Sequence, residues 1–165
     1  MKPLVAIVMG SDSDLEIMNE AKGILKEFGI REETRVLSAH RSPIATAKFA
    51  LQAQNRGIKV IIAGAGGAAH LAGVIAAHTT LPVIGVPIQT KALKGMDSLL
   101  SVVQMPSGIP VATMAIGKAG AKNAGILAAQ ILSLENMAIK KKLEEFKKKL
   151  AKEVLKKDRE VRNKK

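Results

Sequence analysis

Residues 4–9, Leu4-Val5-Ala6-Ile7-Val8-Met9, form an unbroken apolar run that decides the fold. Gly10 ends this run, and residues 13–28 then carry their apolar side chains at helical spacing up to Gly29. A strand that is apolar on both faces is typical of a parallel sheet covered by helices on both sides. The stretch therefore predicts the first strand–helix unit of an α/β protein.

The same alternation of strands and helices continues to residue 134. The pattern predicts further strands at 33–38, 59–63, 82–86 and 110–115, and further helices at 43–55, 68–78, 96–104 and 119–134. Parallel strands are joined by right-handed crossovers. We therefore expect a flavodoxin-like three-layer αβα sandwich with a central parallel sheet.

The composition changes after residue 134. Apolar residues then recur every three or four positions between Lys and Glu, at Ile139, Leu143, Phe146, Leu150 and Val154. This spacing predicts a C-terminal amphipathic helix. Residues 136–165 hold 13 Lys or Arg and 5 Asp or Glu, so they carry +8 of the net charge of +12. We expect one domain, with an α/β catalytic core at 1–135 and a basic amphipathic helix and tail at 136–165. The lysines are interpreted as a solvated face, and the apolar stripe as docked on this subunit or a neighbouring one.

Composition also excludes several classes of function. The chain has no cysteine, which excludes disulfides and thiol chemistry and fits a cytoplasmic location. No signal-like segment opens it, and no apolar run approaches the ~18 residues that span a bilayer. Its only aromatic residues among Phe, Trp and Tyr are three Phe, whereas single-stranded nucleic acids are usually bound on aromatic platforms. We therefore expect neither a membrane nor a nucleic acid as partner.

A candidate site begins at Ser38-Ala39-His40-Arg41, which follows a predicted strand and precedes Pro43 at a helix start. Ligands of open α/β sheets bind at the carboxyl ends of the strands. Arg41 can bind a phosphate or carboxylate through two hydrogen bonds. His40 can transfer a proton near neutral pH.

The turn after the first strand offers an anion site. Ser11 and Ser13 supply hydroxyls and backbone amides beside a helix N-terminus. Asp14 can accept hydrogen bonds from sugar hydroxyls. Ordinary helix capping by Ser or Asp is the alternative interpretation.

The turn after the third strand is Gly64-Ala65-Gly66-Gly67-Ala68-Ala69-His70. It matches the dinucleotide fingerprint, but the acidic residue expected ~20 positions further on is missing, so NAD is not favoured. The small residues instead predict a pocket where backbone approaches a ligand closely, with His70 at its rim. The three histidines are widely spaced, and no metal site is expected.

The loop 87–90 also looks site-like, as do the segments 96–101 and 104–110 around a short helix, with simple loop structure as the alternative. Together the turns suit a ribonucleotide monophosphate that reacts at a small carbon centre.

Several motifs occur in the order typical of one family. They are Gly10-Ser11 with Ser13-Asp14, the stretch 38–43, the stretch 63–70, the stretch 81–87, the stretch 97–101, and 104–106 with 110–113. Over roughly residues 3–135 the chain resembles the class I N5-carboxyaminoimidazole ribonucleotide mutases of purine biosynthesis, the PurE family.

The resemblance implies an isomerase that converts N5-carboxyaminoimidazole ribonucleotide to 4-carboxyaminoimidazole ribonucleotide. It implies a homo-octamer with sites shared between subunits, and no metal or organic cofactor. By the matching positions, Ser11 and Arg41 would hold the phosphate, Asp14 the ribose, and His40 would be the general acid/base. Ser38 would also bind substrate, and the pocket for the carboxylate or CO2 would be lined by Ala65, Gly66, Gly67, His70 and Leu71.

Two alternatives stay open. One is the class II aminoimidazole ribonucleotide carboxylase, which uses free CO2. The other is a non-catalytic nucleotide or nucleic-acid binding protein, suggested by the net charge.

Overall fold

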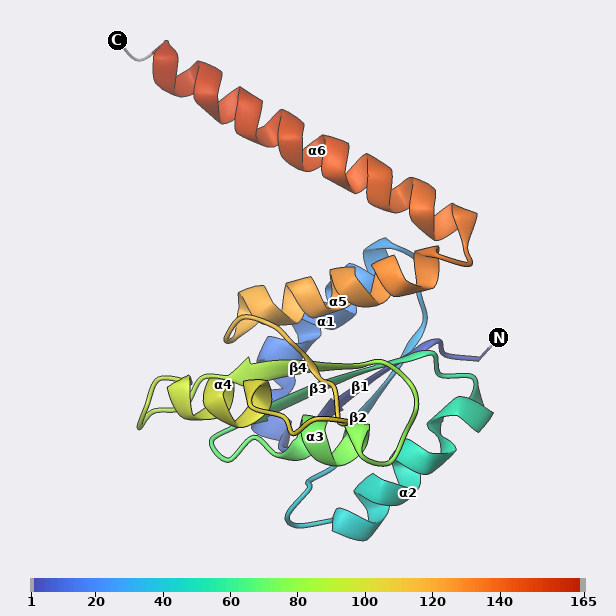
Figure 1. Ribbon diagram of the computed structural model, residues 1–165. Coiled ribbons are helices and arrows are strands. Elements are labelled where there is room, and N and C mark those ends of the chain that lie inside the picture. Colours follow the sequence, from blue (N-terminus) through green and yellow to red (C-terminus); the bar gives the residue numbers. More distant parts are fainter. Residues whose placement is uncertain (1, 164–165) are drawn as a thin grey trace.

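The computed structural model describes residues 2–163, so Lys164 and Lys165 of the predicted tail lie outside the described residues. Its centre is a five-stranded parallel sheet in the order β2-β1-β3-β4-β5 (Figure 1). The strands are β1 (Val5–Met9), β2 (Glu32–Val36), β3 (Val60–Gly66), β4 (Val83–Ile88) and β5 (Ala112–Thr113). This order is that of flavodoxin-like folds, as predicted.

Helices cover both faces of the sheet (Figure 1). One face packs against α1 (Leu15–Glu27) and α5 (Lys118–Ser133). The other packs against α2 (Pro43–Ala53), α3 (Leu71–Ala76) and α4 (Met96–Val103). Short 3₁₀ turns precede α1 at Asp12–Asp14 and follow α2 at Gln54–Arg56.

Strand β1 shows why its residues had to be apolar throughout. Val5, Ile7 and Met9 belong to the core under α1 and α5, whereas Ala6 and Val8 belong to the core on the opposite face. Every residue of β1 is buried. Burial on both faces is therefore the physical reason for the unbroken apolar run.

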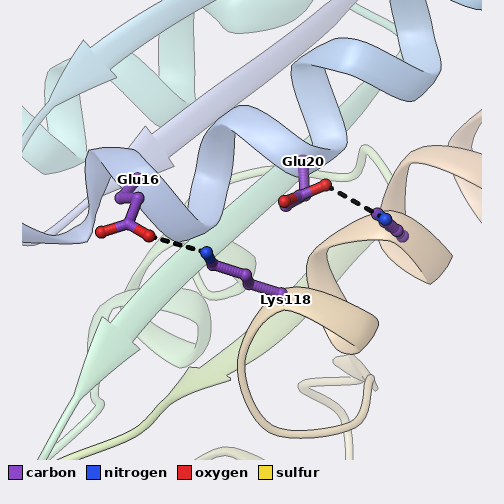
Figure 2. A network of polar contacts seen from close by, with 4 residues as sticks. Glu16, Glu20 and Lys118 are labelled. Atoms are coloured by element: carbon purple, nitrogen blue, oxygen red, sulfur yellow. Dashed lines mark hydrogen bonds and ion pairs between the residues drawn. The ribbon is translucent and has the colours of Figure 1, made fainter.

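Helices α1 and α5 approach each other through small residues. A Cβ added to Gly125 would lie 3.0 Å from the carbonyl oxygen of Ala21. Two ion pairs join the same helices on the N-terminal side of this contact, Glu16 with Lys118 at 2.7 Å and Glu20 with a second lysine of α5 at 3.4 Å (Figure 2). Because these pairs are largely solvent-exposed, the close packing contributes more to the helix contact than they do.

The C-terminal helix α6 (Met137–Arg162) is docked only at its beginning. Ile139 and Leu143 are buried against the α1–α5 core, and the Phe146 ring meets Phe28 edge to face at 5.5 Å. Further along, α6 leads away from the body (Figure 1), and Val154 is 66% exposed. The predicted apolar stripe thus exists, and only its first part packs on this chain.

Some boundaries differ from the prediction. Strand β3 continues to Gly66 because β4 still offers backbone partners there. Helix α3 begins only at Leu71, since Gly67 has a φ of +67° and residues 67–70 form tight turns. The predicted strand at 110–115 is reduced to Ala112–Thr113. None of the helices within residues 2–163 is both long and apolar enough to cross a membrane.

Candidate active site

A cavity of about 430 Å³ lies at the carboxyl ends of β1 to β4. It is lined by Gly10, Ser11, Ser13, Asp14, Ser38, Ala39, His40, Arg41, Ala65, Gly66, Ala68, Leu71, Ile88, Gln89 and Thr90. A slightly larger hollow of about 470 Å³ lies at the opposite ends of the strands, beside Pro3 and Glu32, and contains no histidine. The first cavity is therefore the candidate active site.

The turn after β1 supplies hydroxyl groups and one carboxylate. The Ser11 hydroxyl accepts hydrogen bonds from the Ser13 amide at 3.3 Å and from the Ser13 hydroxyl at 2.9 Å. Ser11 thus caps the 3₁₀ turn, as the capping interpretation expected, and it also faces the cavity.

Asp14 is an unusual carboxylate because only 9% of it is exposed. This burial raises the pKa of the carboxyl group above its ordinary value. Hydrogen bonds from the Ser11 backbone and the Ser13 hydroxyl, and the charge of Arg41, oppose the increase in the pKa. Asp14 is therefore a hydrogen-bonding group held in a largely dry part of the cavity.

The turn after β2 directs Arg41 toward the turn after β1. The Arg41 guanidinium donates to the carbonyl oxygen of Gly10 at 2.9 Å, and the Arg41 amide donates to the Ser38 hydroxyl at 3.1 Å. A guanidinium has five N–H donors, so others remain for a ligand in the cavity. Ser38 accordingly shapes the turn that carries Arg41.

His40 and His70 meet across the site. The Nε2 atom of His40 lies 2.8 Å from the Nδ1 atom of His70, and the two rings are close to perpendicular, at 84°. At this distance one nitrogen must donate and the other accept, so a single proton lies between the two rings. The pair links the turn after β2 to the glycine turn after β3.

The glycine turn forms one wall of the cavity. Ala65, Gly66 and Leu71 line the cavity, whereas Gly67 and His70 do not. The structure therefore brings the predicted site residues to one place, although two of them are not on the cavity surface.

Gln89 and Thr90 complete the lining of the cavity. They follow β4, in the loop 87–90 that the sequence indicates as site-like. The Thr90 hydroxyl donates to the Asp97 carboxylate at 2.9 Å, which anchors this loop to α4.

No group of three or more potential metal ligands comes together within residues 2–163. The cavity instead joins hydroxyl and guanidinium donors, a buried carboxylate, an imidazole pair and a wall of small residues. Such a site can hold an anionic sugar derivative and transfer a proton beside a small group that lies against the glycine turn.

A sequence model of the AIR carboxylase family matches residues 4–153, and the chain belongs to this family. Among curated proteins, the N5-carboxyaminoimidazole ribonucleotide mutase of Bacillus subtilis is 63% identical over 145 residues, or 88% of this chain and 90% of that protein. The protein of the same name from Pyrococcus horikoshii is 60% identical, over 93% of this chain and 85% of its own length. Among solved structures, Treponema denticola PurE superposes with a TM-score of 0.87 at 28% identity, over 97% of this chain and 99% of that one.

Proposed function

We propose that this protein is an isomerase of de novo purine biosynthesis that converts N5-carboxyaminoimidazole ribonucleotide to 4-carboxyaminoimidazole ribonucleotide. The names of its relatives at about 60% identity support this function. The geometric observation that carries the proposal is the His40–His70 pair at 2.8 Å, in which His40 lines the same cavity as Arg41 and the small residues of the glycine turn.

Substrate binding follows from the two ends of the cavity. Arg41 and the hydroxyl of Ser11 hold the 5′-phosphate, since charge-assisted hydrogen bonds to phosphate are strong. Asp14 accepts hydrogen bonds from the ribose hydroxyls. The imidazole base then lies against Ala65, Gly66 and Leu71, with His40 beside it.

In the reaction the substrate gains one proton at nitrogen and loses one proton from C4. The bond between N5 and the carboxylate carbon breaks, the nitrogen takes a proton from His40, and CO2 stays in the pocket. The C4 carbon then forms a bond to CO2, and His40 takes the C4 proton, which restores the aromatic ring. An imidazole near neutral pH can serve both as acid and as base. Confinement of CO2 replaces a dilute bimolecular step by an effectively intramolecular one.

We further propose that the protein acts as a homo-octamer in the cytoplasm, with no metal or organic cofactor. Exposed apolar side chains in α4 and in the turn before it, including Leu93, Met96 and Leu100, support an association of subunits.

A comparison of two substrates tests the function. Purified protein is given N5-carboxyaminoimidazole ribonucleotide, or aminoimidazole ribonucleotide with bicarbonate, and 4-carboxyaminoimidazole ribonucleotide is quantified. We expect rapid product formation from the first and slow formation from the second. Rapid turnover of only the second mixture would make the protein a carboxylase that uses free CO2. Nucleotide binding without turnover of either would leave a non-catalytic binding protein.

A further inference from the structure

Helix α4 reaches the back of the glycine turn through one buried hydroxyl. Ser98 is 0% exposed, and its Oγ atom makes two hydrogen bonds to backbone groups. It donates to the carbonyl oxygen of Ile88 at 2.6 Å and accepts from the amide of Gly67 at 2.9 Å. Ser98 does not line the cavity, so its role cannot be direct contact with a ligand there.

These two backbone groups mark the place where β3 and β4 separate. The strands are paired as far as Gly66 and Ile88, which are the last residues of the two strands. One residue further, the Ser98 hydroxyl connects the Gly67 amide to the Ile88 carbonyl. A buried backbone group needs a partner, and here the side chain supplies it where the neighbouring strand no longer does.

The position of Gly67 determines the course of the next three residues. Gly67 has a φ of +67°. The Ala69 amide donates to the Gly67 carbonyl at 2.8 Å, and the His70 amide donates to the Ala68 carbonyl at 2.8 Å. This tight chain of turns ends at His70, whose Nδ1 atom contacts His40. We therefore expect a shift of the Gly67 amide to move His70 relative to His40.

We infer that Ser98 is a positioning residue of the reaction, which holds the glycine turn closed against CO2 and keeps His70 in contact with His40. This inference rests on the proposed isomerase function. Ser98 acts through Gly67, without touching the substrate. Its loss therefore affects the retention of CO2 and proton transfer more than substrate binding.

Ser101 provides a matched control one turn further along α4. Its hydroxyl lies 2.7 Å from the carbonyl oxygen of Asp97 in its own helix and 3.3 Å from that of Gly67. A hydroxyl has one proton, which goes to the nearer acceptor. The Gly67 carbonyl also accepts from the Ala69 amide, so it keeps a partner without Ser101.

For Ser98→Ala we expect KM within about threefold of the wild-type value, because Ser11, Asp14 and Arg41 belong to other turns. We expect kcat to decrease about tenfold, which corresponds to about 1.4 kcal/mol. We also expect more turnovers to end early. In these the N5–carboxylate bond breaks, the nitrogen takes its proton, and CO2 escapes to leave aminoimidazole ribonucleotide.

The experiment follows single turnovers of the full-length protein with N5-carboxyaminoimidazole ribonucleotide. It quantifies 4-carboxyaminoimidazole ribonucleotide and aminoimidazole ribonucleotide after subtraction of the protein-free decay. Amide hydrogen exchange at Gly67 is measured in parallel. We expect Ser98→Ala to increase both the share of turnovers that end as aminoimidazole ribonucleotide and the exchange rate of the Gly67 amide. We expect Ser101→Ala to change neither.

If Ser98→Ala and Ser101→Ala give the same ratio of aminoimidazole ribonucleotide to 4-carboxyaminoimidazole ribonucleotide, the inference is overturned while the proposed function stands. A wild-type protein that forms no 4-carboxyaminoimidazole ribonucleotide would overturn both. If Ser98→Ala does not fold, Ser98→Cys replaces it. Its thiol has a similar volume and is only a weak donor. The same product ratio and the same exchange rate at Gly67 then test the inference.

Discussion

His40 is the residue on which the proposed chemistry depends most directly. We expect His40→Asn to keep the fold and substrate binding, and to lower kcat by about 10²–10⁴-fold, because an amide cannot exchange the proton. Steady-state kinetics and a binding titration with product measure the two effects. His78→Asn is the control, since His78 contacts the Val74 carbonyl and lies outside the cavity. Near-wild-type turnover of His40→Asn would refute the proton-transfer role.

Arg41 should act on binding rather than on the chemical step. We expect Arg41→Ala to raise KM roughly tenfold to a hundredfold, the range for lost charge-assisted hydrogen bonds. Arg41→Lys should recover part of the affinity, because it restores a charge without the two-pronged geometry. Arg56→Ala is a control, since Arg56 pairs with Glu33 away from the cavity. An unchanged KM for Arg41→Ala would contradict the phosphate contact.

Asp14 links binding to pH. Its pKa is raised in the folded protein by burial, so the folded state holds this proton more tightly than the unfolded state does. Asp14 therefore adds stability at low pH, and this contribution is lost as the pH rises through the raised pKa. In Asp14→Asn the side chain cannot ionise, so this variant does not lose that stability as the pH rises. We expect its melting temperature, relative to that of the wild type, to increase as the pH rises through the acid range.

Thermal melts between pH 3 and 7 check this prediction, with Asp12→Asn, a change at a neighbouring exposed carboxylate, as the control. We also expect Asp14→Asn to bind the substrate more weakly at neutral pH. A relative melting temperature that falls with rising pH would argue against the effect of burial.

The site residues differ in how far sequence could predict them. His40, Arg41 and Ser11 were predictable because polar groups directly after predicted strands mark the ligand-binding edge of a parallel sheet. The contact of His40 with His70 was not, since it depends on the path of the glycine turn. The segment around Ser98 was indicated as site-like, but the two hydrogen bonds of its hydroxyl were not predictable, because a serine within a helix gives no sign that its hydroxyl reaches the ends of two strands.

At the level of elements, the two parts of α6 should contribute differently to stability. We expect Leu143→Ala to lower the free energy of unfolding by about 2 kcal/mol, since a buried leucine leaves a cavity. Val154→Ala, at a residue 66% exposed, should change it by less than about 0.5 kcal/mol. Urea unfolding at one protein concentration measures both. A large effect of Val154→Ala would show that the distal part of α6 packs on another copy.

The strands at the centre of the sheet were easier to predict than those at its edge. Strands β1, β3 and β4 are buried on both faces, so their apolar runs are unmistakable. Strand β5 pairs only with β4 through two residues, and nothing in residues 110–115 shows how much of it finds a partner. Helix α3 was predicted too long because its small residues favour a helix, whereas the tight turns up to His70 prevent one.

At the scale of the whole molecule, much of the positive charge lies in the C-terminal part of the chain. We therefore expect that polyanion binding can be removed without loss of catalysis. Residues 148–165 carry nine basic and three acidic residues, a net charge of +6. We expect a chain that ends at Lys147 to keep its isomerase activity, because the buried contacts of α6 precede that position. It should bind heparin more weakly than the full chain does, as eluting salt concentration measures. Loss of activity with retained folding would show that the distal helix serves the site.

The edge-to-face contact of Phe28 and Phe146 has a practical consequence for spectroscopy. The chain contains no tryptophan or tyrosine, so it has almost no absorbance or fluorescence of its own above 280 nm. A Phe146→Trp substitution would place a single fluorophore where α6 meets α1. Its emission would then report, without background, whether the C-terminal helix stays docked during assembly and turnover.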